Sequence, residues 1–271
     1  MFDCKRSSTD PLLRAMLKNH RLHLLRWPKK GVCPGDLVIE KQDGQTVRTP
    51  LSTVFVSAPS PATLVRPAEP MVNIEETFSG KLDAKATIGL LDSIATELGG
   101  AKGSFDGAYE KAAQVVLRIR SAQWNDCDPA ELSMFVGGAE VRSDQGLFRE
   151  DEKLYIISGV ATAKSIEIIG YDGRGVEIAA DAEVAETAAA NANLKSRKDG
   201  ATGIVYSGAD PMPFGVELLK LELRKGGWAI SGADNYVAVR GSDAGFDKSA
   251  FAVLGDASTG DVFIDLVDAS L

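Results

Sequence analysis

The chain has 271 residues, of which 44% are hydrophobic and 25% charged, a composition ordinary for a globular protein with a core of its own. No run approaches the roughly 18–20 uninterrupted apolar residues of a transmembrane helix, and the N-terminus is charged where a secretory signal would be apolar. We therefore expect a protein made and kept in the cytosol. Cys4, Cys33 and Cys127 lack the spacing of a zinc site or a disulfide framework, so we expect reduced thiols.

The net charge of −8 is unevenly distributed. Eight basic residues oppose only Asp3 and Asp10 in the first thirty positions, whereas six aspartates oppose only Lys248 in residues 241–271. A basic end on an acidic protein indicates an anionic partner, and lipid headgroups, nucleic acid or another protein segment all qualify.

The first half of the chain predicts short helices and strands. Asp10 followed by Pro11 is a helix start, so we expect a helix over residues 11–19, followed by a strand over 36–40. Five prolines between residues 50 and 70 predict an extended connection with little regular structure. Asp128-Pro129 predicts a second short helix, with Glu131 at the capping-box position.

Three segments alternate apolar and polar residues as half-buried strands do: 79–90, 109–120 and 176–194. The first also has a leucine-rich face of period four, and the alanines of the third suit a helix, so a helical interpretation stays open for both. The alternating apolar positions of interest are Leu82, Ala84, Ala86, Ile88 and Leu90, then Val115, Leu117 and Ile119, and then Ile178, Ala180, Ala182 and Val184.

Further strands are expected over residues 154–169, as one or two strands, and over 204–206, 214–224, 228–230 and 236–239, with glycine and proline turns between them. Asp172-Gly173 is a hairpin signal. The predicted fold class is therefore α+β, with a twisted, mainly antiparallel central sheet and short surrounding helices.

Catalytic patterns are not found in the sequence. His20 and His23 have no glutamate at the spacing of a metalloprotease, and Asp126 with Asp128 is a weaker candidate for a cation site than Asp128 is for a helix cap. We therefore do not expect an enzyme. Cys4 lies beside Lys5 and Arg6, where a free thiol and reversible S-acylation both remain open.

A family resemblance emerges from short motifs taken in their order. They are Asp10-Pro-Leu-Leu-Arg14, Leu22-His-Leu-Leu-Arg-Trp-Pro28, Pro34-Gly-Asp-Leu37, Phe78-Ser-Gly-Lys-Leu82 and Asp210-Pro-Met-Pro-Phe-Gly215 with the following Val-Glu-Leu-Leu-Lys-Leu-Glu-Leu223. Over nearly its whole length the chain resembles the bacterial gasdermins. The resemblance implies a gasdermin N-terminal-domain-like fold in residues 1–245 and a C-terminal autoinhibitory tail in 246–271. It also implies that a partner protease, often caspase-like, releases the tail in antiphage defence. It further implies palmitoylation of Cys4, and no other cofactor is expected.

With this resemblance, the alternating segments are interpreted as the strands that enter a membrane, since a bilayer-spanning strand needs about 9–11 residues. The expected partners are the protease, membrane phospholipids and further copies of the chain, and we expect no nucleic acid. The chain is expected to be a cytoplasmic monomer before cleavage and to form a pore in the inner membrane after it. The small-residue stretch that we expect to be cut is Arg240, Gly241, Ser242, Asp243, Ala244, Gly245 and Phe246. The tail residues expected to pack on the domain are Phe246, Phe251, Val253, Leu254, Phe263 and Ile264.

Two other classes of protein remain. One is a β-rich module that binds lipid or another ligand without forming a pore, and the other is an enzyme with an unrecognised site. Proteolysis that converts an inert protein into one that permeabilises liposomes would distinguish a latent pore-forming protein from both of these classes.

Overall fold

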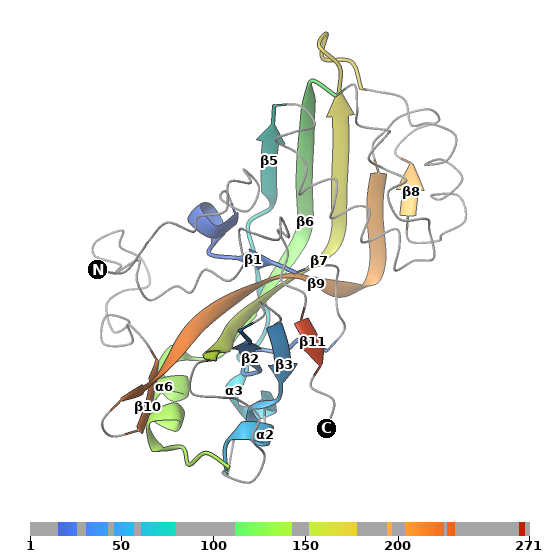
Figure 1. Cartoon of the computed structure of the whole chain (residues 1–271). Coiled ribbons are helices and arrows are strands. Elements are labelled where there is room, and N and C mark those ends of the chain that lie inside the picture. The colour runs from blue at the N-terminus through green and yellow to red at the C-terminus, as the bar shows by residue number, and fades with distance from the viewer. Residues whose placement is uncertain are drawn as a thin grey trace, which may run out of the picture.

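Figure 1 shows the computed structural model of the chain. The structure describes residues 16–25, 31–42, 46–56, 61–79, 112–142, 152–177, 194–196, 204–224, 227–230 and 266–268.

A single twisted sheet organises the described residues. Its central strand is β7 (Lys153–Tyr171), which is antiparallel to β6 (Gln114–Asp126) on one side and to β9 (Ile204–Arg224) on the other. Next to the start of β7, β2 (Leu37–Glu40) pairs with it and carries β3 (Thr46–Thr49) on its outer side. The expectation of an α+β fold with a mainly antiparallel sheet is confirmed. No helix among the described residues is long and apolar enough to cross a membrane.

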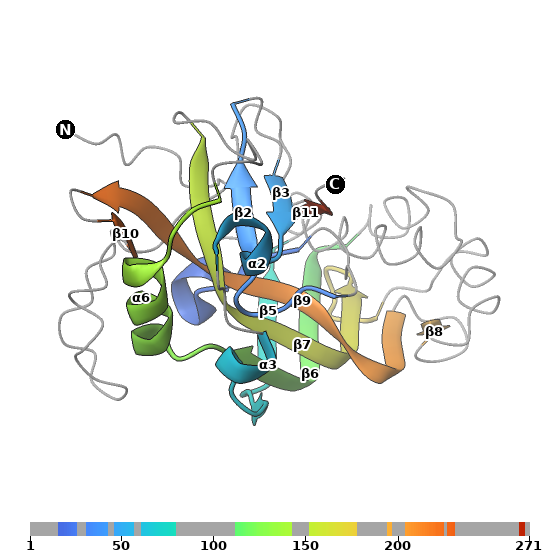
Figure 2. The same cartoon turned by 90° about the horizontal axis from the view of Figure 1, so that it is seen from below.

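Strand β9 is continuous where the sequence predicts two strands with a turn between them. Its pairing with β7 shifts register at three places, between Ile157 and Gly159, Ala161 and Thr162, and Ala163 and Ser165. Pro211 and Pro213 lie inside β9 in this irregular part. Prolines are tolerated at bulges because the ladder hydrogen bond is interrupted there in any case, and bulges bend a strand. The prolines therefore mark a bend in β9, which Figures 1 and 2 show, and not its end.

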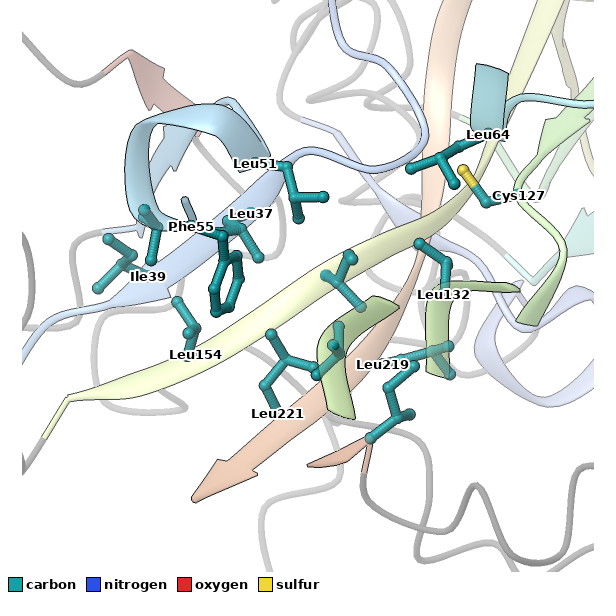
Figure 3. Close-up of a cluster of buried hydrophobic side chains, with 14 of the residues drawn as sticks. Leu37, Ile39, Leu51, Phe55, Leu64, Cys127, Leu132, Leu154, Leu219 and Leu221 are labelled. Atoms are coloured by element: carbon teal, nitrogen blue, oxygen red, sulfur yellow. The ribbon is translucent and has the colours of Figure 1, made fainter. Parts of the chain in front are cut away.

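Below the bend, one face of the sheet is covered by short helices. Residues of α2 (Leu51–Val54), α3 (Pro61–Leu64) and α6 (Pro129–Gly138) pack onto β2, β7 and β9. The prediction of little regular structure over residues 50–70 was wrong, because prolines can start helices and both Pro50 and Pro61 do so. Figure 3 shows the buried cluster: Leu37, Ile39, Leu51, Phe55, Leu64, Cys127, Leu132, Leu154, Leu219 and Leu221.

The predicted helix start at Asp128 is confirmed. Its carboxylate accepts hydrogen bonds from the backbone N–H groups of Ala130 at 2.8 Å and Glu131 at 3.4 Å, which would otherwise lack partners at the helix N-terminus. Helix α6 then packs against β10 (Gly227–Ile230), the strand that forms a hairpin with the end of β9.

The opposite face of the same strands forms a second cluster with the N-terminal segment. Leu25 and Val32 pack there with Val38, Tyr155 and other buried residues of β7 and β9. The helix expected over residues 11–19 is present in its described part as a π-helix, η1 (Met16–His20), followed by the short strand β1 (His23–Leu24). Burial on both faces fixes the lower half of the sheet from two sides.

A close contact fixes the end of β6 against β7. Gly159 lies beneath the indole of Trp124, and a Cβ atom at position 159 would overlap the ring. Next to it, the backbone N–H of Gly35, a residue with φ of +91°, donates to the carbonyl of Ile157 at 2.7 Å. The Pro34-Gly35 motif is thus explained by a turn that joins β7 through its backbone.

We predict that Gly159→Ala destabilises the fold by about 1–3 kcal/mol, because Trp124 must move out of a packed position. Urea denaturation followed by tryptophan fluorescence measures the change. Gly137→Ala is the matched control: nothing lies within 4 Å of a Cβ there and the residue is helical, so that variant should be neutral or gain about 0.5–1 kcal/mol. Equal effects of the two substitutions would contradict the contact.

Candidate functional site

The end of the sheet above the bend brings together the strands that flank two of the alternating segments. Strand β5 (Ile74–Phe78) pairs antiparallel with β6, so that Phe78 lies opposite Val115, which lies opposite Gly170 of β7. Ile168 of β7 lies opposite Ile204, the first residue of β9. The connections from β5 to β6 and from β7 to β9 therefore leave and re-enter the sheet at one end, the upper end in Figure 1, and each joins strands that run in opposite directions.

One face of this upper sheet is apolar. Val115, Leu117 and Ile119 have no exposed side-chain surface, and they lie opposite Phe78, Glu76 and Ile74 of β5. On the other side they face buried residues of β7, with Ile168 opposite Leu117 and Ile166 opposite Ile119. The apolar positions predicted on β6 thus form part of a continuous apolar face, here called the apolar face.

The opposite face carries a row of charges across three strands. Arg118 of β6 lies in register with Glu75 of β5 and with Glu167 of β7. The Arg118 guanidinium donates to both carboxylate oxygens of Glu75, at 3.0 and 3.3 Å, and its Nη1 atom lies 3.7 Å from Glu167 Oε2. Glu167 is only 8% exposed. Opposite charges on directly facing residues stabilise strand pairing, so this row, the charged ladder, fixes the register of β5, β6 and β7.

Glu76 is the exception on the apolar face, and the N-terminal helix contacts it. Asn19 Nδ2 donates to Glu76 Oε1 at 3.2 Å, and His20 Nε2 lies 3.8 Å from the same oxygen. The two polar side chains that end η1 therefore meet the one carboxylate of the apolar face on β5.

The candidate metal sites of the sequence are structural features instead. Arg66 lies between Asp126 and Asp128: its Nε donates to Asp126 Oδ1 at 2.9 Å, and its Nη1 lies 3.8 Å from Asp128 Oδ2. A guanidinium thus occupies the place expected for a cation. His23 is buried in β1 while His20 faces Glu76. Within the described ranges, no group of histidine, cysteine, aspartate and glutamate side chains has the arrangement of a metal site.

The described thiols and a desolvated carboxyl give no reactive constellation. Cys33 and Cys127 are free, as expected, and burial raises the pKa of Cys127 to about 12, which keeps it protonated at neutral pH. Desolvation also raises the pKa of Glu217, although Ser158 Oγ donates to its carboxylate at 2.6 Å and opposes that rise. The Ser158–Glu217 pair lies at the first register shift between β7 and β9 and holds the strands together there.

Of the predicted membrane-inserting positions, the structure describes those on β6: Val115, Leu117 and Ile119. Residues 82–90 and 178–184 lie outside the described residues, as do Cys4, the proposed cleavage stretch 240–246 and the tail positions from Phe246 to Ile264. The tail residues that are described, Leu266–Asp268, form β11, which runs parallel to β3. Sequence reasoning missed the charged ladder, because Glu75 and Arg118 are 43 residues apart, Arg118 and Glu167 are 49 apart, and only the strand register aligns them.

A long, bent antiparallel sheet, with the apolar face and the charged ladder on opposite sides above the bend and short helices covering one face below it, defines the class of fold. The solved structure of a gasdermin from Bradyrhizobium tropiciagri has this fold, with a TM-score of 0.67 at 20% identity over 98% of this chain and 100% of that one.

Sequence comparison gives the family. The model of the Bacterial Gasdermin Family matches residues 25–227, and the chain belongs to that family. A gasdermin of Lysobacter enzymogenes is 26% identical over 80% of this chain and 82% of its own length. The gasdermin of Bradyrhizobium tropiciagri is 22% identical over 98% of this chain and 100% of its own length. The resemblance inferred from the motifs is confirmed, and family and fold together support a pore-forming protein, in a family not known for enzymes.

We predict that Arg118→Leu destabilises the fold by about 1–3 kcal/mol, because the largely buried Glu167 and its neighbour Glu75 both lose a charged partner. Arg120→Leu, an exposed position two residues along the same strand, should cost less than about 1 kcal/mol. Thermal unfolding measures both. The double variant Arg118→Leu/Glu167→Leu should recover part of the loss, and a double variant no more stable than Arg118→Leu alone would contradict the ladder.

Proposed function

We propose that this gasdermin is a latent pore-forming protein whose upper sheet extends into a membrane-spanning β-barrel made by many copies, once a protease has removed its C-terminal tail. The observation that carries the proposal concerns which face of the sheet odd- and even-numbered residues occupy. If the described strands were extended into the alternating segments, the apolar residues of those segments would fall on the apolar face; this agreement is here called the phase.

The phase argument starts on β5, whose even-numbered residues Ile74 and Phe78 lie on the apolar face and whose odd-numbered Glu75 lies on the charged ladder. Side chains alternate with a period of two along a strand. If β5 continued without a bulge, the even positions would stay on the apolar face, and they are the apolar ones: Leu82, Ala84, Ala86, Ile88 and Leu90.

The same phase holds on β7. Ile166 and Ile168 lie on the apolar face and Glu167 on the ladder. β7 ends at Tyr171, and residues 172–176 turn so that Glu177 lies opposite Tyr171 in an antiparallel bridge. Glu177 therefore lies on the same face as Tyr171 and Glu167, and beyond it the even positions carry Ile178, Ala180, Ala182 and Val184, whereas the odd positions carry Asp181 and Glu183. If these segments never extended the sheet, nothing would require their apolar residues to fall on the same face as those of the preceding strand. Agreement in both segments supports an extended sheet with an apolar face toward lipid and a polar face toward water.

Strand directions support closure of such a sheet by repetition. The order β5, β6, β7, β9 alternates in direction at every step. Because four is an even number, a second copy placed beside the first would continue the alternation without a parallel pair. A closed barrel leaves no backbone group unpaired in hydrocarbon, which is the condition that any lipid-exposed sheet must meet.

Control by the tail is supported by the pairing of β11. Residues Leu266–Asp268 add a parallel strand to the outer side of β3, with Val267 opposite Val47. Backbone hydrogen bonds contribute only about 0.5–1.5 kcal/mol each, so a three-residue strand is held weakly by itself. While tethered it benefits from an effective concentration of about millimolar, and a cut in residues 240–246 would remove that advantage. The domain boundary at residue 245 follows from this proposal.

The N-terminal part would then meet the membrane. Its excess of basic residues suits anionic lipid headgroups, and a palmitoyl group on Cys4 would strengthen that attachment. The resulting site of action is the inner membrane, reached from the cytoplasm. Loss of membrane integrity would kill the cell, and antiphage defence is the role that the bacterial gasdermins suggest for it. No part of the proposal requires nucleic acid or a metal.

We predict that Ile88→Arg abolishes dye release from anionic liposomes after tail removal, whereas Thr87→Arg leaves it intact. An arginine on the lipid-facing side costs about 2–4 kcal/mol per subunit at the bilayer midplane, while its neighbour on the polar side faces water. Val184→Arg should fail in the same way. Circular dichroism of the uncut proteins checks that all variants fold. Equal leakage by the two neighbouring variants would contradict the phase, and loss of leakage in both would contradict a water-filled lumen.

The tail is tested with a site-specific protease sequence placed at Gly241–Gly245. We predict no dye release before cutting and release afterwards, because cleavage frees β11 from β3 by dilution alone. The native chain treated with the same protease is the control and should remain inert. Leakage that is equal before and after cutting would refute the latch, and lipid binding without leakage would favour the β-rich binding module.

A further inference from the structure

One short segment near the N-terminus contacts both outer strands of the upper sheet. Residues 16–25, here called the strap, contain η1 at one end and β1 at the other. The η1 end contacts Glu76 of β5, and β1 pairs with Gly215 and Val216 of β9. Strands β5 and β9 are separated by β6 and β7, so the strap links two strands that do not pair with each other. Figure 1 shows η1 beside β5 and β1 at the bend.

The β1 end of the strap is held tightly against β9. Besides the pairing of β1, the backbone N–H of Leu25 donates to the carbonyl of Phe214 at 3.1 Å. A Cβ atom at Gly215 would lie only 3.3 Å from the carbonyl oxygen of His23, so the two backbones approach closely. The leucines of this end are all buried: Leu22, Leu24 and Leu25. This is the fixed end of the strap.

The η1 end is held by fewer contacts. Asn19 and His20 contact one oxygen of Glu76, and the side chains of His20 and Glu76 are 26% and 20% exposed. Polar contacts that water can reach contribute little to stability. Met16 at the start of η1 is buried, so lifting the helix also uncovers this side chain. Between the two ends Arg21 has a φ of +58°, a left-handed conformation that is costly for a residue with a side chain and persists only where surrounding contacts impose it.

We infer that the strap is a second restraint on the latent protein, separate from the tail, and that its η1 end must leave Glu76 before the upper sheet can enter a membrane. The inference rests on the proposed function, because it names a step that precedes insertion. It adds a restraint that a cut in residues 240–246 does not itself remove. Among the described residues, the tail strand β11 pairs with β3, whereas the strap contacts β5 and β9.

The position of η1 is the first reason for this inference. Glu76 lies on the apolar face, which the proposed function turns toward lipid, and it precedes the alternating segment 79–90 by three residues, about 10 Å along a strand. A helix with its side chains is about 10–12 Å across. Left in place, η1 would therefore lie against the start of the membrane-spanning part. Its polar ends, Asn19 and His20, would meet lipid there, which is unfavourable for polar groups without partners.

The shape of the sheet is the second reason. In a barrel made by many copies, each set of four strands covers a small part of the circumference, so it must be flatter than an isolated twisted sheet. The strap holds Glu76 on one outer strand and Gly215 on the other through ten residues, and this limits how far the two strands can move apart. Release of the η1 end removes that limit while β1 stays on β9.

The first test fixes η1 on β5. Asn19→Cys/Glu76→Cys, made in a Cys4→Ser/Cys33→Ser background with the protease sequence at Gly241–Gly245, places two thiols where contacting side chains stood. A short thiol crosslinker should join them, and mass spectrometry of a digest identifies the link. After tail removal we expect the crosslinked protein to lose the dye release from anionic liposomes that the same protein shows without crosslinker.

A matched crosslink below the bend is the control. Glu40 and Lys153 also contact through their side chains, at 3.1 Å, but β2 and β7 need not separate, so crosslinked Glu40→Cys/Lys153→Cys should release dye as its untreated form does. Equal release by both forms of the Asn19–Glu76 pair would overturn the inference while leaving the pore intact. Failure of that pair to be joined under conditions that join the control would overturn it as well.

The second test loosens the η1 end. Asn19→Ala/His20→Ala and Glu76→Ala should each shorten the delay before dye release from the cut protein by about two- to tenfold, the range that the loss of a hydrogen bond gives. The uncut variants should remain inert, because the tail is still attached. Combining all three substitutions should give no further gain, since each set removes the same contact. Additive effects would show that the contact is not the restraint and would overturn the inference.

Hydrogen exchange of the uncut protein tests the strap without any pore. Asn19→Ala/His20→Ala should speed exchange of the backbone amides of Ile74–Phe78, because η1 no longer covers β5, and the crosslink should slow it. Exchange that neither change affects would overturn the strap. Absence of dye release from the cut chain without further substitutions would instead contradict the proposed function, so the two failures are told apart.

Discussion

Antiparallel backbone pairing along β7 is the interaction on which the rest of the structure depends. β7 is bound on one side by β2 and β6 in succession and on the other by β9 through thirteen residue pairs. The two hydrophobic clusters below the bend and the apolar face above it are all assembled on its residues. Because side chains alternate along the strand, one register error would transfer every one of these residues to the wrong face.

The register is accordingly fixed at several independent points. The charged ladder aligns β5, β6 and β7 above the bend. At the end of β6, Trp124 covers Gly159, and Ser158 donates to Glu217 across a register shift. Below it, the backbone of Ile157 both donates to Asp36 and accepts from Gly35. These contacts use different chemistry, so the loss of any one leaves the others to hold the strand.

The sequence predicted elements well where local signals decide them. Asp128-Pro129 gave a helix because a carboxylate cap acts on the next three residues, and Leu37–Glu40 gave a strand between turns. Prediction from the sequence failed where contacts between residues far apart in the chain decide the structure. Pro211 and Pro213 have the local signature of a turn, and only the bulged pairing with β7 lets them remain inside a strand. Glu75, Arg118 and Glu167 carry no local signal of belonging together. The described strands likewise are needed to assign odd and even positions to a face, which is the observation used to propose the membrane-spanning segments.

The two edges of the sheet are linked through β7, and in the proposed mechanism this pairing would connect removal of the tail to the strands above the bend. The tail strand β11 pairs with β3, β3 with β2, and β2 with residues Lys153–Ile156 of β7. On its other side β7 pairs with β9 from Leu154 onward, at Leu221 and then Leu219. Between the end of β10 at Ile230 and the start of β11 at Leu266, the chain connects these two sides directly. A cut in residues 240–246 would therefore separate β11 covalently from β10 and β9, and the pairing of β11 with β3 would then be what holds it to the described sheet. In the proposed mechanism, cleavage would thus change the constraint on the sheet without altering any residue of β5, β6, β7 or β9.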